Sequence, residues 1–226
     1  MKPFVFINVA VTADGKIDTF ERNGAAISSA QDRERVDRLR ADSDAVMVGG
    51  KTLLEEQPKL TVRNEAWRRE REMRGLSPNP IKVGVVTRAD IPPESKFLTF
   101  GVARIVIFTT HQTSKAQVEI LRSQGAQVFV HDSPRVDLTQ ALHTLSELGV
   151  KRLMVEGGGT LNFELLRLGL VDELIMYVAP LIFGGESAPT LAAGLGLTRD
   201  EAIALKLISM EQLNEGGVLI KYEVEK

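Results

Sequence analysis

Short apolar stretches rich in β-branched residues recur along this chain and alternate with segments of helical periodicity. Strands are predicted at 4–11, 44–50, 81–87, 103–110, 126–131, 152–157 and 172–180. Helices are predicted at 28–43, 51–58, 114–125, 137–150 and 160–168. This alternation predicts a single α/β domain over 1–226, because each helix carries the chain back to begin another parallel strand. The tail differs: two apolar runs flank Gly216 and Gly217, which predicts an antiparallel C-terminal hairpin beside a mostly parallel central sheet flanked by helices.

Composition excludes several classes of function. The 226 residues carry a net charge of −2, which gives no electrostatic reason to expect nucleic acid or a membrane surface as a partner. Cysteine is absent, so disulfides, thiolate nucleophiles and cysteine-bound zinc are excluded. The histidines lack metal-ligand spacing, and no metal site is predicted. We expect a cytoplasmic protein, because the apolar run near the start is too short and too polar for a signal peptide or a membrane span.

Three consecutive glycines, Gly157, Gly158 and Gly159, lie between a predicted buried strand and a predicted helix. Glycine is entropically costly to order, so the run needs a physical reason. One is a tight turn that binds nothing. The other is a phosphate site, because N–H groups at a helix N-terminus are unpaired and the helix dipole favours an anion. Glu156 and Thr160 flank the run, and Thr160 would cap the helix or donate its hydroxyl, so phosphate binding is favoured.

The spacing of these glycines matches neither a P-loop nor G-x-G-x-x-G, which indicates a nucleotide site of another architecture. A second strand ends in Gly49 and Gly50, with Thr52 at the start of a short helix. Ligands of open α/β sheets bind beyond the carboxyl ends of strands, so the two glycine-ended strands are predicted to converge on one crevice. The segment 8–17 adds polar residues around an Asp-Gly turn, which are either solvated or functional.

Together, three segments resemble one enzyme family. They are NVAVTADGKI (8–17), ISSAQDRERVDRLRADSDAVMVGGKTLLEEQPKLTVR (27–63) and LMVEGGGTLNFELLRLGLVDELIMYVAPLIFGG (153–185). In this order they are similar to the reductase of riboflavin biosynthesis, and the likeness covers nearly the whole chain. The resemblance implies a dihydrofolate reductase-like fold, a homodimer, and NADPH-dependent reduction of the ribosyl group of a ribosylaminopyrimidine 5′-phosphate, a small-molecule substrate, to ribityl.

The resemblance also implies where the cofactor lies. The family's pyrophosphate cradle corresponds here to Gly157, Gly158, Gly159, Thr160 and Leu161. Thr52 would contact the cofactor from the facing loop. Where the family has an aspartate-serine pair near the adenosine 2′-phosphate, this chain has Thr87 and Arg88. A hydroxyl and a guanidinium suit a phosphate, so NADPH is still expected rather than NADH.

The substrate positions transfer in the same way. By resemblance, Arg63, Ser28 and Ser29 hold the ribose phosphate, with Arg40 a weaker candidate. Asn8 lies near the pyrimidine.

The catalytic set implied by the resemblance is Lys16, Glu56 and Glu156. Lys16 would lie near the reacting carbon, and Glu156 would also contact the ribose hydroxyls. If Glu156 is buried, it is suited to act as a general acid near neutrality. Where the family has two aspartates before a proline, this chain has Glu56 and Gln57. Glu56 keeps an acidic group with a longer reach, whereas Gln57 does not.

The sequence leaves the exact reaction open. The zinc signature of the deaminase that is often fused to this reductase is absent, so a reductase alone is predicted. The stand-alone form favours the 2,5-diaminopyrimidinone as substrate over the aminouracil that deamination forms from it. A dihydrofolate reductase, a related reductase of another aldehyde or pteridine, and a non-catalytic nucleotide-binding protein are less favoured functions for the same residues.

Overall fold

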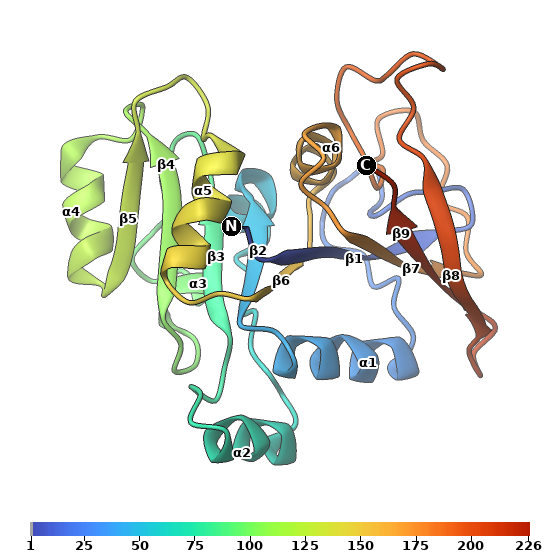
Figure 1. The fold of residues 1–226 in the computed structure, drawn as a ribbon, viewed down its shortest axis with the longest axis horizontal. Helices are drawn as coiled ribbons and strands as arrows, with labels where there is room; N and C mark the ends of the chain where they lie inside the picture. The colour runs from blue at the N-terminus through green and yellow to red at the C-terminus, as the bar shows by residue number, and fades with distance from the viewer. Residues whose placement is uncertain (1) are drawn as a thin grey trace. The chain divides into compact units, whose positions relative to one another are not determined.

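Strands and helices alternate along the chain in the computed structural model, which describes residues 2–226 (Figure 1). The chain forms two compact units. Unit 1 consists of Asp37–Met154 with the first residues of the chain up to Pro3, and unit 2 consists of Phe4–Val36 and Val155–Lys226. The N-terminal strand and the C-terminal third of the chain therefore belong to one unit, although they are far apart in sequence.

Unit 1 contains a sheet whose strands follow the order β5-β4-β3-β2-β6. Their bounds are β5 (Ala126–His131), β4 (Ile105–Thr110), β3 (Ile81–Val85), β2 (Ala45–Gly49) and β6 (Arg152–Val155). The four strands from β2 to β5 pair in parallel. Every residue of β2 and β4 is buried. This explains their continuous apolar sequence, because parallel strands have both faces covered.

Five helices lie wholly within unit 1 among the described residues, and all but the π-helix begin at a polar side chain that caps the first turn. They are η1 (Thr52–Glu56), which is a short π-helix, α2 (Glu65–Met73), α3 (Lys96–Thr99), α4 (Lys115–Ser123) and α5 (Leu138–Glu147). The side chain of Ser114 accepts the N–H of Gln117 at the start of α4, which packs against β5 (Figure 1). The apolar residues that predicted α5 are its buried face.

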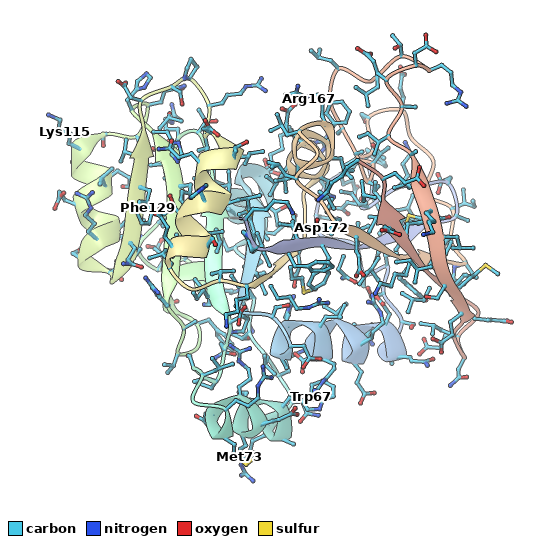
Figure 2. All side chains as sticks on the ribbon, viewed as in Figure 1. Trp67, Met73, Lys115, Phe129, Arg167 and Asp172 are labelled. Carbon is cyan, nitrogen blue, oxygen red and sulfur yellow. The ribbon has the colours of Figure 1, made fainter. Side chains whose placement is uncertain are left out.

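The charged segment 64–80 is attached to the rest of unit 1 through α2. Arg38 donates to both carboxylate oxygens of Glu70, and its guanidinium lies 5.7 Å from the ring of Trp67. Arg71 is buried and donates to the carbonyl groups of Ala41, Ser43 and Ser77. Trp67 and Met73 lie on different sides of the helix (Figure 2). The segment therefore contains a helix, and one of its arginines, Arg71, hydrogen-bonds inside the protein rather than facing solvent.

Unit 2 contains the strand order β1-β7-β9-β8. Their bounds are β1 (Phe4–Thr12), β7 (Glu173–Ala179), β9 (Val218–Val224) and β8 (Leu205–Gln212). β1 and β7 are parallel, whereas β9 is antiparallel to both β7 and β8, as the predicted hairpin requires. Helix α6 (Gly159–Arg167) precedes β7, and helix α1 (Ala30–Ala41) begins in unit 2 and ends in unit 1. No helix among residues 2–226 is long and apolar enough to cross a membrane.

Candidate active site

The three glycines form the turn that leads from β6 into α6, and the structure gives separate reasons for two of them. Gly157 has φ +99°, a conformation that L side chains rarely adopt. A Cβ on Gly159 would collide with the carbonyl oxygen of Thr190. Gly158 has φ −75° and ψ −176°, which any residue adopts. The close neighbour of the backbone at Gly159 is therefore another part of the same unit.

The start of α6 nevertheless suits an anion. Gly158 occupies the N-cap position, and no side chain of the described residues caps the helix. The first N–H groups of a helix have no partner inside it, and the helix dipole makes this end positive. The predicted capping role of Thr160 is wrong, because the helix begins one residue earlier and leaves Thr160 exposed within its first turn. Its hydroxyl stays a candidate donor.

The turn that follows β1 is tied to the loop after β7. Thr12 donates its hydroxyl proton to Asp14 at 2.6 Å, and the Asp14 carboxylate accepts the N–H groups of Phe183 and Gly184. The hydrogen bond from Thr12 lowers the pKa of Asp14. Lys16 Nζ, which is partly buried, donates to the carbonyl oxygen of Ala188 at 3.4 Å. The predicted Asp-Gly turn thus orders a loop and places Lys16 against it.

Two asparagines of unit 2 have a buried side-chain oxygen without a hydrogen-bond partner among the described residues. They are Asn8 on β1 and Asn162 on α6. Asn8 was predicted to bind substrate, and a buried amide oxygen without a donor is costly unless another group supplies one. Asn162 was not predicted, because a single polar residue in a helical pattern gives no signal of its burial.

Glu156 follows β6 directly, at the carboxyl end of the strand, as expected. Its side chain is partly exposed rather than buried, so the complete burial on which its predicted role as a general acid depended is not present. The side chain stays beside the glycine turn, where it is open to contact with a ligand.

The two serines of unit 2 that were predicted to hold phosphate differ in their hydrogen bonds: Ser29 bonds through its side chain and Ser28 through its backbone carbonyl. Ser29 is buried, and its hydroxyl oxygen accepts the N–H of Asp32 as the cap of α1. The carbonyl group of Ser28 accepts a hydrogen bond from Arg33. The structure therefore gives Ser29 a helix-capping role that the sequence prediction did not include.

In unit 1 the predicted cofactor residues gather at the carboxyl ends of β2 and β3. Gly49 of β2 is paired with Val85 of β3, and a Cβ on Gly50 would lie 3.1 Å from the side chain of Val86. Thr52 begins η1 immediately after β2, and Thr87 follows β3. Thr52 and Thr87 therefore belong to the same edge of the parallel sheet in this unit.

Arg88 is exposed at this edge, and its Nε donates to Asp90 at 2.5 Å. An exposed ion pair of this kind is weak and open to exchange. The neighbouring Thr87 is also exposed, and its carbonyl oxygen accepts the hydroxyl protons of Thr109 and Thr110. Thr87 and Arg88 are therefore both accessible to an anionic group.

Arg63 is exposed, while Asp37 of α1 holds its backbone. The two buried carboxylate oxygens of Asp37 accept the N–H groups of Arg63 and Asn64 at 2.7 and 2.8 Å. Arg40, the weaker candidate, donates to the carbonyl oxygen of Thr61 at 3.2 Å. Asp37 is the residue that sequence reasoning missed here, because it reads as one of many charges on a surface helix.

The other departure from the family pattern lies at the end of η1. Glu56 is exposed and Gln57 has φ +48°, so the short helix stops in a left-handed residue immediately after the acid. Among the residues that the structure describes, no group of three His, Cys, Asp or Glu side chains is arranged to hold a metal ion.

Residues 3–219 match the family described as "RibD C-terminal domain". The chain belongs to this family. It is 38% identical over 216 residues to the 2,5-diamino-6-ribosylamino-4(3H)-pyrimidinone 5′-phosphate reductase of Archaeoglobus fulgidus, with 96% of each protein covered. The resemblance inferred from the three segments is thereby confirmed.

Solved structures show the same fold. The RibD structure from Acinetobacter baumannii superposes with a TM-score of 0.81 and 24% identity, covering 99% of this chain and 58% of that chain. A dihydrofolate reductase from Enterococcus faecalis, solved with NADP(H), gives a TM-score of 0.50 with 11% identity and covers 99% of this chain and 97% of that chain. The predicted dihydrofolate reductase-like α/β fold is confirmed.

Proposed function

We propose that this chain is the NADPH-dependent reductase that converts the ribosyl group of 2,5-diamino-6-ribosylamino-4(3H)-pyrimidinone 5′-phosphate to ribityl in riboflavin biosynthesis. Membership of the family and the name of the archaeal relative support the substrate. The observation that carries the proposal is the uncapped N-terminus of α6 behind the glycine turn. Such a helix end binds phosphate through backbone N–H groups.

The residues present fit a phosphorylated dinucleotide. In unit 2, the residues Gly157 to Leu161 would hold the pyrophosphate with backbone N–H groups and the Thr160 hydroxyl. In unit 1, Thr52 would contact the cofactor, and the exposed Thr87 and Arg88 would bind the 2′-phosphate. When bound, NADPH supplies the hydride for the reduction.

The substrate side of the proposal rests on cationic and amide groups. Arg63 and Ser28 would bind the ribose phosphate, with Ser29 contributing its hydroxyl proton while its oxygen caps α1. Asn8 would bind the pyrimidine. Hydride addition to C1 of the ring-opened ribosylamine, which is the carbon of a C=N or C=O bond, leaves a negative charge on the nitrogen or oxygen of that bond.

A proton must neutralise that charge. Lys16 and Glu156 are the candidates in unit 2 to hold or deliver this proton, and Glu56 is the candidate in unit 1. The bond to the carbonyl oxygen of Ala188 restrains the Lys16 ammonium, which suits a group that must meet one reacting atom.

We also propose that both units form one reductase domain, in a homodimer located in the cytoplasm. The family match over residues 3–219 as one domain supports the first part. Strand β8 supports the second, because it is the last strand of its sheet and all of its residues are exposed. Leu207, Ile208 and Met210 are among them, and an exposed apolar edge strand favours pairing with another copy.

The test is an anaerobic assay that follows loss of nicotinamide absorbance with purified protein, NADPH, and each ribosylaminopyrimidine phosphate in turn. Oxidation of NADPH in the presence of the diaminopyrimidinone confirms the proposal. Oxidation with the aminouracil alone places the enzyme after deamination instead. If neither compound is reduced although NADPH binds, the reductase proposal fails, and the replacement of the second family aspartate by Gln57 becomes the first explanation to examine.

A further inference from the structure

Asn162 is a buried polar residue that the proposed function does not use. Its side chain lies beneath the glycine turn, with Nδ2 3.8 Å from the position of a Cβ on Gly157, and the residue is completely buried. Nδ2 donates to the carbonyl oxygen of Leu191 at 2.9 Å. Oδ1 is buried without a partner among the described residues. A buried amide oxygen without a hydrogen-bond donor destabilises the fold, and an apolar side chain at this position would avoid that penalty. The hydrogen bond to Leu191 is therefore what an amide side chain contributes here and an apolar one does not.

Leu191 belongs to a stretch that we call the bridging segment (188–193), because it contacts two parts of the candidate site. Its middle residue Thr190 places its carbonyl oxygen directly over Gly159. The same residue pairs with Lys16 in an antiparallel bridge, and Lys16 Nζ donates to the carbonyl oxygen at position 188. One short stretch of chain therefore separates the phosphate cradle from the lysine of the proposed reacting centre.

Backbone hydrogen bonds hold both sides of the bridging segment. The N–H of Ala193 donates to the carbonyl oxygen of Gly159 at 3.0 Å, and the N–H of Ile17 donates to the carbonyl oxygen of Pro189 at 2.9 Å. The segment has no helix or strand of its own. Its position consequently depends on these few bonds and on the side-chain bond from Asn162.

We propose that Asn162 is a positioning residue that fixes Lys16 relative to the cofactor cradle by holding the bridging segment against α6. The inference rests on the proposed function, since it takes Lys16 as a group at the reacting centre. Proton and hydride transfer are steep functions of distance and angle, so a small displacement of Lys16 lowers turnover without weakening cofactor binding. If Asn162 merely stabilised the fold, its substitution would not lower kcat while leaving the Kd of NADPH unchanged.

The experiment compares Asn162→Ala with Thr190→Gly. Thr190→Gly makes the backbone of the bridging segment more flexible at a partly exposed position and leaves the buried core unchanged. Thr190→Gly therefore keeps the test available if Asn162→Ala does not fold. Ser95→Ala is the matched control, because it removes a buried helix cap of α3 in unit 1, remote in sequence from the segment. For each variant, kcat, the Kd of NADPH and the amide hydrogen exchange of Ile17 are measured. Lys16→Ala is combined with Asn162→Ala in a double-variant cycle.

We expect Asn162→Ala and Thr190→Gly to lower kcat by about tenfold or more, with the Kd of NADPH changed by less than about twofold. The Ile17 N–H should exchange faster in both variants and at the wild-type rate in Ser95→Ala. In the Lys16→Ala background, Asn162→Ala should cause almost no additional loss of kcat. If Lys16→Ala and Asn162→Ala lowered kcat independently, so that their fold losses multiplied in the double variant, the inference would be overturned. An unchanged exchange rate of the Ile17 N–H in Asn162→Ala would also overturn it.

Failure of the proposed function can be distinguished from failure of the inference about Asn162. A wild-type protein that reduces neither pyrimidine refutes the reductase proposal, but the exchange rate of Ile17 still shows whether Asn162 holds the Lys16 turn. Unchanged exchange in that case overturns the inference as well.

Discussion

Lys82 provides a quantitative test of the packing in unit 1. It lies within β3 and is completely buried. Its Nζ donates to the carbonyl oxygens of Phe97 and Phe100 at 3.0 and 2.5 Å, at the end of α3. Burial lowers the pKa of Lys82 from 10.5 to about 8. The ammonium is therefore retained at neutral pH at a cost to the stability of the fold.

The pH dependence follows from this lowered pKa. Between pH 8 and pH 10.5 the unfolded chain binds more protons at this lysine than the folded chain, so the free energy of unfolding rises with pH across that window. With these two pKa values, the contribution of Lys82 to the free energy of unfolding should increase by about 2 to 3 kcal/mol between pH 7 and pH 10. Below pH 7 the contribution is nearly constant.

Urea unfolding of the wild type and of Lys82→Met at pH 7, 8.5 and 10 isolates this effect, because all other groups titrate in both proteins. The free energy of unfolding of the wild type minus that of Lys82→Met should rise with pH by the stated amount. Lys82→Gln serves as a second reference, since it keeps a donor for the two carbonyl groups and does not titrate. A difference that stays flat or falls with pH would refute the reasoning.

Three further predictions concern the site. Gly159→Ala should raise the Kd of NADPH by about tenfold or more in a fluorescence titration, because the collision of the methyl group with the Thr190 carbonyl oxygen forces the backbone at the start of α6, with its phosphate-binding N–H groups, to shift; Gly75→Ala, with a positive φ in open space, should cost stability only. Glu156→Gln should lower kcat by on the order of a hundredfold with little change in NADPH affinity, and wild-type turnover would remove Glu156 from the mechanism. Arg88→Ala should reduce the NADPH-over-NADH ratio of kcat/KM by about tenfold, whereas an unchanged ratio would assign the 2′-phosphate to other residues.

The sequence by itself determined the pattern of elements. Parallel strands are buried on both faces, so β2 and β4 appear as continuous apolar runs, and the amphipathic spacing of α5 appears in its leucines. The C-terminal hairpin and the glycine turn before α6 were also predictable, since local backbone requirements limit which residues occupy such turns. The short helix α3 was not predicted, because four residues are too few to show a period.

Only the tertiary structure decided what the polar residues do. Arg71 lies in a charged segment and Lys82 in a predicted strand, yet both are buried and donate to carbonyl groups that no local pattern identifies. Asn162 meets Leu191, and Gly159 meets Thr190, across long separations in sequence. Periodicity reports which face of an element is apolar, because burial repeats with the element itself. It carries no information about which distant backbone group a single buried donor will meet, since that depends on how the loops between the elements pack.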